Sequence, residues 1–489
     1  MASTTSIPET CPLSKVPLHI VAAILEQSGS VQQLRLTILS HRIFRDAFYE
    51  TPRAIVAGLV ANQIPSDTLP FLITILELTK ITHDNAHIFI DISSRLQRNL
   101  EETRAASLVD FSLSDYAFIS RKYAASESLA QSLADEVTPI LADRLGLDRR
   151  SSNVTPQESF RLNRAFLRYQ LLSTRAQLLS TYATRADDLA LRLDLSWEYF
   201  RQFWYSSTSS FSPWVNEQLR CVYFYLERKV TEAMEELAVH DVAWSQQQYV
   251  CTTDEDIGDP EIRFFLLQGL EFLSSVVRAK TYDEKIRLFR LVDFPSTPEI
   301  SRASFASDVP TGAVIEIVPD LGIRDLDTPL DPYVKLELDE LIGPLDGKYD
   351  STDSIPFRAW LVALVGKRVY CHYSRDFSNF WDCAYTMWDY ANVPGMNMRE
   401  KFDELHHKSR HFQRKSTDDW KDHYESPFYW QITDIYLAGG TGYWPEDGPD
   451  CPDFGRINGL SEEKKRELLD KWQSGVGLGQ LSLLNLHDD

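Results

Sequence analysis

The chain has 489 residues, of which 43% are hydrophobic, 25% charged and 12% aromatic. These values exclude a wholly disordered chain and a small disulfide-stapled scaffold, and they suggest about two or three domains. The formal net charge is −21 at pH 7. An acidic chain is repelled by phosphate groups, so we expect neither nucleic acid nor an anionic membrane surface as a partner.

The acidic residues are concentrated in two segments. Residues 231–260 contain eight acids and no Lys or Arg, and residues 293–353 contain fourteen acids against four bases. Such runs are typical of solvated loops and linkers. The six cysteines are widely separated and form no C-x-x-C pair. We therefore expect free thiols and, because no secretory signal or long apolar span is evident, a cytoplasmic or nuclear location.

The first part of the chain has the pattern of short helices. Residues 1–12 read as a loose tail. Apolar residues at three- and four-residue spacings then predict a helix from Leu18 to Leu25, a second over 31–39 after a Ser-Gly-Ser break, and a third over 43–48. Thr51-Pro52 is typical of the start of a further helix.

Longer helical patterns follow. They cover residues 69–78, 86–109, 114–145, 155–205 and 214–240, and a stretch that begins at Pro260 and continues through Val276. Thr155 and Glu158 have the spacing of a capping box, in which each residue accepts a hydrogen bond from the other's backbone. Ser-rich residues 206–212 are predicted to separate two of these helices.

The composition of the chain changes at about residue 293, where long helical patterns end. Residues 293–356 contain eight of the 23 prolines, and we interpret them as an acidic linker or an irregular subdomain with short strands at 314–318 and 334–338. The rest contains seven of the 11 tryptophans; helices are expected over 356–372 and 376–392 and from Ser461 to about Gly475. The predicted fold class is mainly all-α, with a module over 13–50, a helical domain over 51–292 and a Trp-rich C-terminal region over 357–489.

Residues 13–48 resemble an F-box. The matching features are an aliphatic-Pro pair, a helix of paired aliphatics, a turn, and an apolar helix that ends in a Ser-x-x-aromatic sequence. They are carried by Leu13, Val16, Pro17, Ile20, Ile24, Leu25, Leu34, Leu36, Ser40, Arg42, Phe44 and Ala47. The segment is also similar to degenerate F-box-like N-termini of large fungal proteins. It departs from the family pattern at Val16, where Leu is usual, at Phe44, where Trp is common, and at His19.

The resemblance implies a function. F-box modules dock a Skp1-type adaptor and thereby join a cullin ubiquitin ligase, so the chain would be a substrate receptor that holds an unidentified protein target near the ligase. Three short helices cannot bury enough apolar area alone, so their exposed aliphatics need a partner surface. We assign the adaptor contact to Val16, Pro17, Ile20, Ile24, Leu34 and Leu36. No cofactor and no catalytic residues are expected.

Two other interpretations stay open. In one, residues 13–48 are the first helices of a continuous bundle in a plain interaction scaffold, which predicts few exposed aliphatics on the first two helices. In the other, the chain is a helical enzyme in which Asp418, Asp419 and Asp422 bind Mg²⁺, because their D-D-x-x-D spacing can place carboxylates on one helix face. No second metal motif accompanies them, and a solvated helix start explains the acids equally well.

Two further motifs have similar ambiguity. His406, His407 and His411 have spacing that could bind zinc, but flanking basic residues favour a local basic patch. The glycine-rich run 439–444 lacks the lysine of a phosphate loop. Its Thr441, Tyr443 and Trp444 either line a ligand or partner surface or form a tight turn packed under its own aromatic rings.

Overall fold

The computed structural model describes residues 16–81, 111–145, 154–185, 211–246, 260–292, 339–365 (except 340, 344, 348 and 352), 378–390, 400–402, 427–444 and 454–474. Helices make up 76% of the interpretable residues, beside one short two-stranded sheet, so the chain is mainly all-α as predicted. Among the described helices, none combines the length and the apolar character that crossing a membrane requires.

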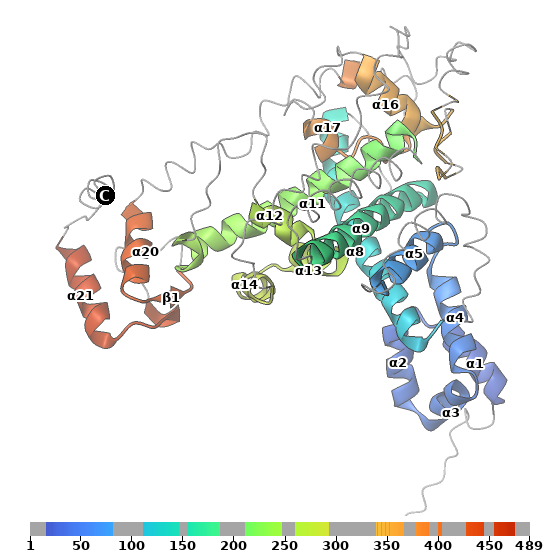
Figure 1. Ribbon diagram of the computed structural model, residues 1–489, viewed down its shortest axis with the longest axis horizontal. Coiled ribbons are helices and arrows are strands. Elements are labelled where there is room, and N and C mark those ends of the chain that lie inside the picture. Colours follow the sequence, from blue (N-terminus) through green and yellow to red (C-terminus); the bar gives the residue numbers. More distant parts are fainter. Residues whose placement is uncertain are drawn as a thin grey trace, which may run out of the picture.

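The chain begins with five helices: α1 (Leu18–Glu26), α2 (Val31–Ser40), α3 (Arg42–Glu50), α4 (Pro52–Gln63) and α5 (Leu69–Thr79). The predicted elements over 18–48 are confirmed, and Pro52 is the first residue of α4 as expected. Helices α1–α4, the N-terminal module, project from one end of the helical body, and α5 connects them to it (Figure 1). Helices α4 and α5 pack against helix α8, so the module joins the body without a gap in the apolar core.

Three long helices form the body: α8 (Leu113–Leu145), α9 (Pro156–Arg185) and α11 (Pro213–His240). Helix α9 packs against both α8 and α11 (Figure 1). Three shorter helices, α12 (Pro260–Leu266), α13 (Leu270–Arg278) and α14 (Tyr282–Arg290), cover the remaining side of α11. The predicted capping box is confirmed, because the Glu158 N–H donates to Thr155 Oγ1 (3.2 Å) and the Thr155 N–H donates to Glu158 Oε2 (2.9 Å).

The helix predicted from Pro260 through Val276 is interrupted at Gly269. This residue has a φ of 87°, a conformation that favours glycine. The break lets the Leu270 N–H donate to the buried Gln170 side chain at 2.7 Å. Apolar residues continue at helical spacing on both sides of the break, so the periodicity alone predicted one helix where two are present.

The described residues between 339 and 390 include two helices that pack on α11, and they are less regular than predicted. They contain α16 (Ile355–Val365) and α17 (Ser378–Asp382), followed by turns instead of the helix expected to residue 392. The turns free the Thr386 and Met387 carbonyls, which accept hydrogen bonds from Gln218 and Arg161 at 3.2 Å each. The expectation that the acidic residues of 293–353 are solvated is wrong for Asp350, which is fully buried.

The C-terminal elements form a small unit at the far end of α11 (Figure 1). They are α20 (Pro427–Leu437), β1 (Thr441–Gly442), the 3₁₀ helix η11 (Phe454–Arg456), β2 (Ile457–Asn458) and α21 (Glu462–Gln473). Strands β1 and β2 are antiparallel, with Gly442 opposite Ile457. The unit has its own core, to which Val242 contributes from the segment between α11 and the 3₁₀ helix η4 (Trp244–Gln246).

Candidate functional site

The N-terminal module is held in shape by caps at its short helices. Ser30 Oγ accepts from the Gln33 N–H at 3.0 Å and begins α2. His41 is the only residue between α2 and α3, and its Nδ1 accepts from the Ile43 N–H at 3.2 Å. Such side-chain caps satisfy backbone donors that a helix leaves open at its N-terminus. The two caps therefore fix where α2 and α3 begin.

The inner faces of these helices form a small apolar core. Helix α1 packs against α3 and α4, and α2 packs against α3. Buried side chains from all four helices meet in the core: Val21, Leu25, Leu34, Ile43, Ala47, Ile55, Val56, Leu59 and Val60. This core is continuous with that of the body through α4 and α5.

The outer face of α1 is apolar and exposed. Ile20 is 45% exposed and Ile24 is 51% exposed, although both are large aliphatic side chains. Ala23 is also exposed, and Pro17 is exposed at the N-cap. Positions 20, 23 and 24 share one helix face by their three- and four-residue spacing. We call Pro17, Ile20, Ala23 and Ile24 the α1 stripe; within the described residues no part of the protein covers the outer faces of its isoleucines.

The six residues assigned to the adaptor contact do not form one surface. Val16 is half-buried against the core, and Pro17, Ile20 and Ile24 belong to the α1 stripe. Leu34 is 2% exposed and packs in the core, so the assignment of this side chain to a partner surface is corrected. Leu36 is 63% exposed but lies on α2, which stands apart from α1 across the module (Figure 1). Residues 34 and 36 lie about 200° apart around a helix, so one faces inward when the other faces outward.

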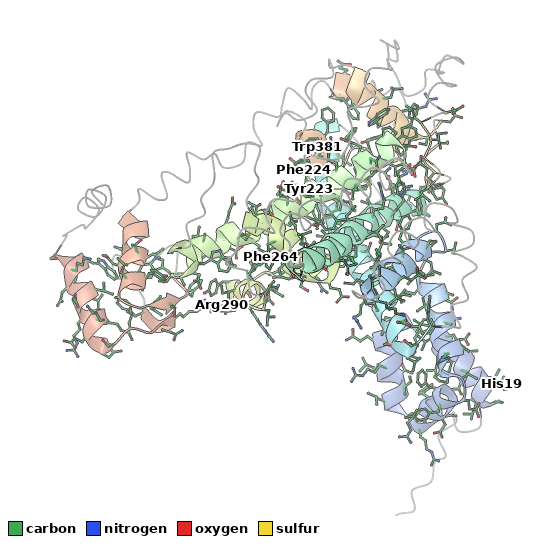
Figure 2. The ribbon with its side chains drawn as sticks, viewed as in Figure 1. His19, Tyr223, Phe224, Phe264, Arg290 and Trp381 are labelled. Carbon is green, nitrogen blue, oxygen red and sulfur yellow. The ribbon has the colours of Figure 1, made fainter. Side chains whose placement is uncertain are left out.

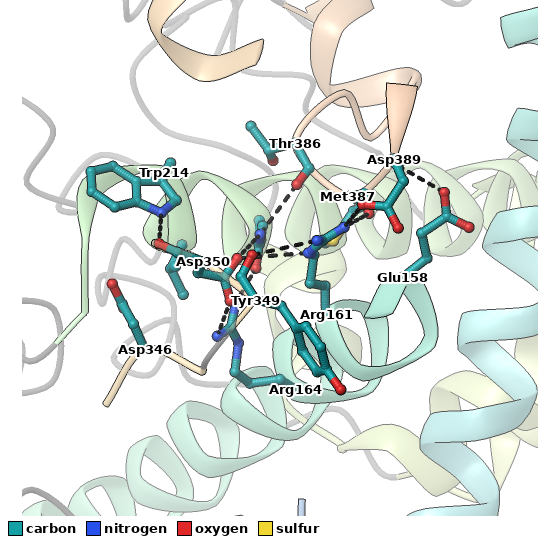
Figure 3. A network of polar contacts seen from close by, with 12 residues as sticks. Glu158, Arg161, Arg164, Trp214, Asp346, Tyr349, Asp350, Thr386, Met387 and Asp389 are labelled. Atoms are coloured by element: carbon teal, nitrogen blue, oxygen red, sulfur yellow. Dashed lines mark hydrogen bonds and ion pairs between the residues drawn. The ribbon is translucent and has the colours of Figure 1, made fainter. Parts of the chain in front are cut away.

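A buried polar network in the body is the feature that sequence reasoning missed (Figure 3). Arg164 and Asp350 are both fully buried and form an ion pair with Arg164 Nη1 2.6 Å from Asp350 Oδ2. Gln218 donates to Asp350 Oδ1 at 3.2 Å, and the Trp214 indole donates to the Asp350 carbonyl at 3.0 Å. The network thus joins α9, α11 and residues 349–350.

A second ion pair extends the network toward the start of α9. Arg161 Nη1 lies 2.7 Å from Asp389 Oδ1, and the Asp389 N–H donates to Glu158 Oε1 at 2.8 Å (Figure 3). Thr155 Oγ1 donates to the other Asp389 oxygen at 2.9 Å. Segments that are separated by more than 200 residues in the chain are therefore tied to one helix end.

Burial shifts the ionisation of groups beside this network. Desolvation and, secondly, the neighbouring Arg164 lower the pKa of Arg168 to about 9. Desolvation raises the pKa of Asp346 to about 6, against hydrogen bonds from Ser212 that lower it. All of these groups are engaged with other protein groups. The arrangement fixes the packing of α9 and α11, and we assign it a structural role.

The aromatic residues of α11 and α17 also have a structural role. Phe224 and Trp381 stack with ring centroids 4.1 Å apart and an interplanar angle of 3° (Figure 2). The Trp381 indole N–H donates to buried Glu217 at 2.6 Å. The predicted free thiols are confirmed for Cys221 and Cys383, which are buried beside these elements. Burial raises the pKa of the Cys221 thiol, which makes it an inert side chain.

The proposed ligand surface at residues 441–444 is occupied by the protein itself. Tyr443 stacks on His240 with centroids 5.4 Å apart, and the Arg456 guanidinium lies 4.1 Å from the Tyr443 ring centroid. Trp444 is buried in the small C-terminal core, and Thr441 is exposed on β1. Both Tyr443 and Trp444 therefore serve to attach the C-terminal unit to α11.

The remaining candidates are the Asp and His residues that the sequence suggests as metal ligands. Asp418, Asp419, Asp422, His406, His407 and His411 lie outside the described residues. Among the residues that the structure describes, no group of three or more His, Cys, Asp or Glu side chains is arranged to hold a metal ion.

Comparison of the chain with protein-family models, curated proteins and solved structures finds no match.

Proposed function

We propose that the chain is a protein-recruitment factor whose α1 stripe docks a Skp1-type adaptor and whose helical body holds a protein target near a cullin ubiquitin ligase. The observation that carries the proposal is the exposure of Ile20 and Ile24 on the outer face of α1, whose inner face is packed in the core of the module. A scaffold in which residues 13–48 only complete a bundle predicts few exposed aliphatics on the first two helices. Four of them are exposed there: Ile20, Ile24, Leu36 and Leu39.

The pattern of exposure suits a protein groove. Half of the ten large exposed hydrophobic side chains among the described residues belong to the N-terminal module, which is a small part of the chain: Ile20, Ile24, Leu36, Leu39 and Tyr49. Clusters of exposed apolar side chains mark interaction sites more often than single exposed residues do. Positions i, i+3, i+4 and i+7 on one helix face are the anchors that a groove accepts, and Pro17, Ile20 and Ile24 occupy such positions on α1.

The body is suited to hold a target because it is rigid. The buried ion pairs and the Phe224–Trp381 stack fix α9, α11 and α17 relative to one another. A receptor that acts by proximity needs a fixed distance between its two docking ends, and it needs no bond chemistry of its own.

Co-expression with a Skp1-type adaptor followed by size-exclusion chromatography tests the proposal. The wild-type chain is expected to co-elute with the adaptor as a one-to-one complex. The double variant Ile20→Glu/Ile24→Glu is expected to lose at least about a hundredfold in affinity, because two central apolar anchors become charged. Both side chains are half-exposed in the free protein, so the variant should fold.

Leu437→Glu provides the matched control. Leu437 is 76% exposed on α20, far from the N-terminal module, and its replacement makes the same kind of change, an exposed aliphatic side chain to Glu, at one position. Co-elution of the adaptor with the Ile20/Ile24 double variant, or separate elution of the wild-type chain and the adaptor, contradicts the proposal.

A further inference from the structure

The N-terminal module has a second exposed surface that the α1 stripe does not include. Leu36 and Leu39 lie on the outer side of α2 and are 63% and 71% exposed. Tyr49 is 72% exposed on α3. These three are among the most exposed large hydrophobic side chains of the described residues. Their exposure has no role in the core of the module, which is formed by the opposite sides of the same helices.

Exposed arginines accompany these apolar side chains. Arg42 and Arg45 are exposed on α3 and precede Tyr49 by seven and four residues, so the three side chains share the outer face of that helix. Arg35 is exposed on α2 beside Leu36. We call the set Arg35, Leu36, Leu39, Arg42, Arg45 and Tyr49 the arginine–leucine face.

The two helices bring this face together at their junction. Only His41 separates α2 from α3, and its cap on Ile43 fixes the turn. Leu39 and Arg42 are three residues apart across that turn, within about 11 Å even for an extended chain. The end of the apolar pair on α2 and the start of the arginine row on α3 are therefore close to each other at this junction.

The charge of the module is opposite to that of the chain. Residues 18–63 contain three acids and four arginines, which gives a formal charge of +1 within a chain of −21. Among the described residues, Arg35 and Arg45 form no ion pair. Arg42 pairs with Asp46 at 3.2 Å, but both side chains are well exposed. An exposed pair of this kind contributes little stability, so it can open for a partner carboxylate.

We infer that the arginine–leucine face binds an acidic segment of a partner protein, with aliphatic or aromatic anchors of that segment against Leu36, Leu39 and Tyr49 and its carboxylates against the arginines. Arg and Tyr are favoured residues at the centres of protein interfaces. Guanidinium groups pair with carboxylates in a two-point geometry. A nucleic acid is disfavoured, because half of the face consists of Leu36, Leu39 and Tyr49, which offer no cation to a phosphate backbone. This inference does not depend on adaptor docking to the α1 stripe.

Peptide display on the full-length chain tests the inference. A random peptide library is selected in parallel against the wild-type chain and against the double variant Arg42→Glu/Arg45→Glu. Peptides enriched on the wild type are expected to be acidic with apolar anchors and to be depleted on the variant. A consensus peptide is then synthesised, and its Kd is expected to rise at least tenfold for the variant and to rise with ionic strength.

Two further variants distinguish the face from other surfaces. Leu36→Ser/Leu39→Ser is expected to weaken the consensus peptide to a similar degree, and both changes are at exposed positions that leave the fold intact. Arg287→Glu reverses the charge of one exposed arginine on α14, outside the face; it is the control for charge reversal and is expected to leave the Kd unchanged. The Ile20→Glu/Ile24→Glu variant is also expected to bind the peptide normally, which separates this inference from adaptor docking.

Several results would overturn the inference. Enrichment of neutral or basic peptides, equal enrichment on the wild type and the Arg42/Arg45 variant, or no enrichment would each do so. Light scattering provides one more outcome: if the wild-type chain self-associates and the Arg42/Arg45 variant is monomeric, the face is covered by a second copy of this acidic chain and not by another protein.

Discussion

Replacement of Asp350 by alanine should strongly destabilise the protein. The carboxylate is fully buried, accepts from Arg164 at 2.6 Å and from Gln218 at 3.2 Å, and lies 3.7 Å from Arg161 Nε. Its removal leaves the fully buried Arg164 guanidinium without its counter-charge. Breaking a buried ion pair from one side costs about 3–5 kcal/mol, because the remaining charge stays desolvated. We expect Asp350→Ala to lower the free energy of unfolding by that amount.

Urea denaturation followed by tryptophan fluorescence and by far-ultraviolet circular dichroism measures the effect. Agreement of the two probes is needed before a free energy is derived from a chain of this size. Asp46→Ala is the matched control, since it breaks the exposed pair with Arg42 and should change the free energy of unfolding by about 0.5 kcal/mol or less.

A double variant tests the physical reason. If the cost of Asp350→Ala arises from the unpaired guanidinium, adding Arg164→Met should restore about 2 kcal/mol, because the buried charge is then removed together with its partner. Two results would refute the reasoning. One is a loss of less than about 1 kcal/mol in Asp350→Ala. The other is additivity, in which Arg164→Met costs as much stability in the Asp350→Ala background as it does in the wild-type chain.

Three further predictions follow from local geometry. The pKa of Asp346 is raised to about 6, against 3.8 in the unfolded chain, so the folded protein holds this proton more tightly. The group's contribution to stability therefore falls by about 2 kcal/mol as pH rises from 4 to 6, and in urea titrations the Asp346→Asn variant should lack this component. Gly442→Ala should loosen the C-terminal unit, because Gly442 has a φ of 110° and a Cβ would lie 2.5 Å from the Arg456 carbonyl oxygen. Hydrogen exchange over 427–474 should become faster in this variant, and unchanged exchange would contradict the prediction. Thr281→Ala removes the cap of α14, where Thr281 accepts from the Glu284 N–H at 3.3 Å, and should lower the free energy of unfolding by about 1 kcal/mol.

Local sequence signals predicted the helices well. Apolar spacing identified α1, α2, α8 and α11 to within a few residues, and side chains that cap a helix identified the starts of α9 and α21. The Ser461 cap is present, since Ser461 Oγ accepts from the Lys464 N–H at 3.2 Å. These signals depend on neighbours within one or two helical turns, so a single sequence contains them.

Long-range polar packing could not be predicted in the same way. Asp350 belongs to an acidic run that reads as solvated, and its partner Arg164 is 186 residues away in the chain. One signal was present: Arg161, Arg164 and Arg168 recur at three- and four-residue spacing within an apolar helix. Buried arginines at such spacing require buried acceptors, but the sequence does not say which acids supply them.

The candidate site shows the same difference between local signals, which a single sequence contains, and long-range packing, which it does not show. The F-box resemblance selected Ile20 and Ile24, which are exposed, and it also selected Leu34, which is buried. The helical phase of α2 could have shown that Leu34 and Leu36 face opposite ways. The aromatic residues at 443 and 444 were ambiguous, because their packing partners His240 and Arg456 come from different segments of the chain.

Hydrogen exchange of the full-length chain with and without a Skp1-type adaptor tests the central claim most directly, because it reports where a partner sits. The account predicts slower exchange over residues 16–27, which contain the α1 stripe, with no change over the α9 and α11 core at 156–178 and 213–240. No protection of residues 16–27 by a saturating adaptor, or protection confined to the body, would contradict the claim that α1 is a docking helix.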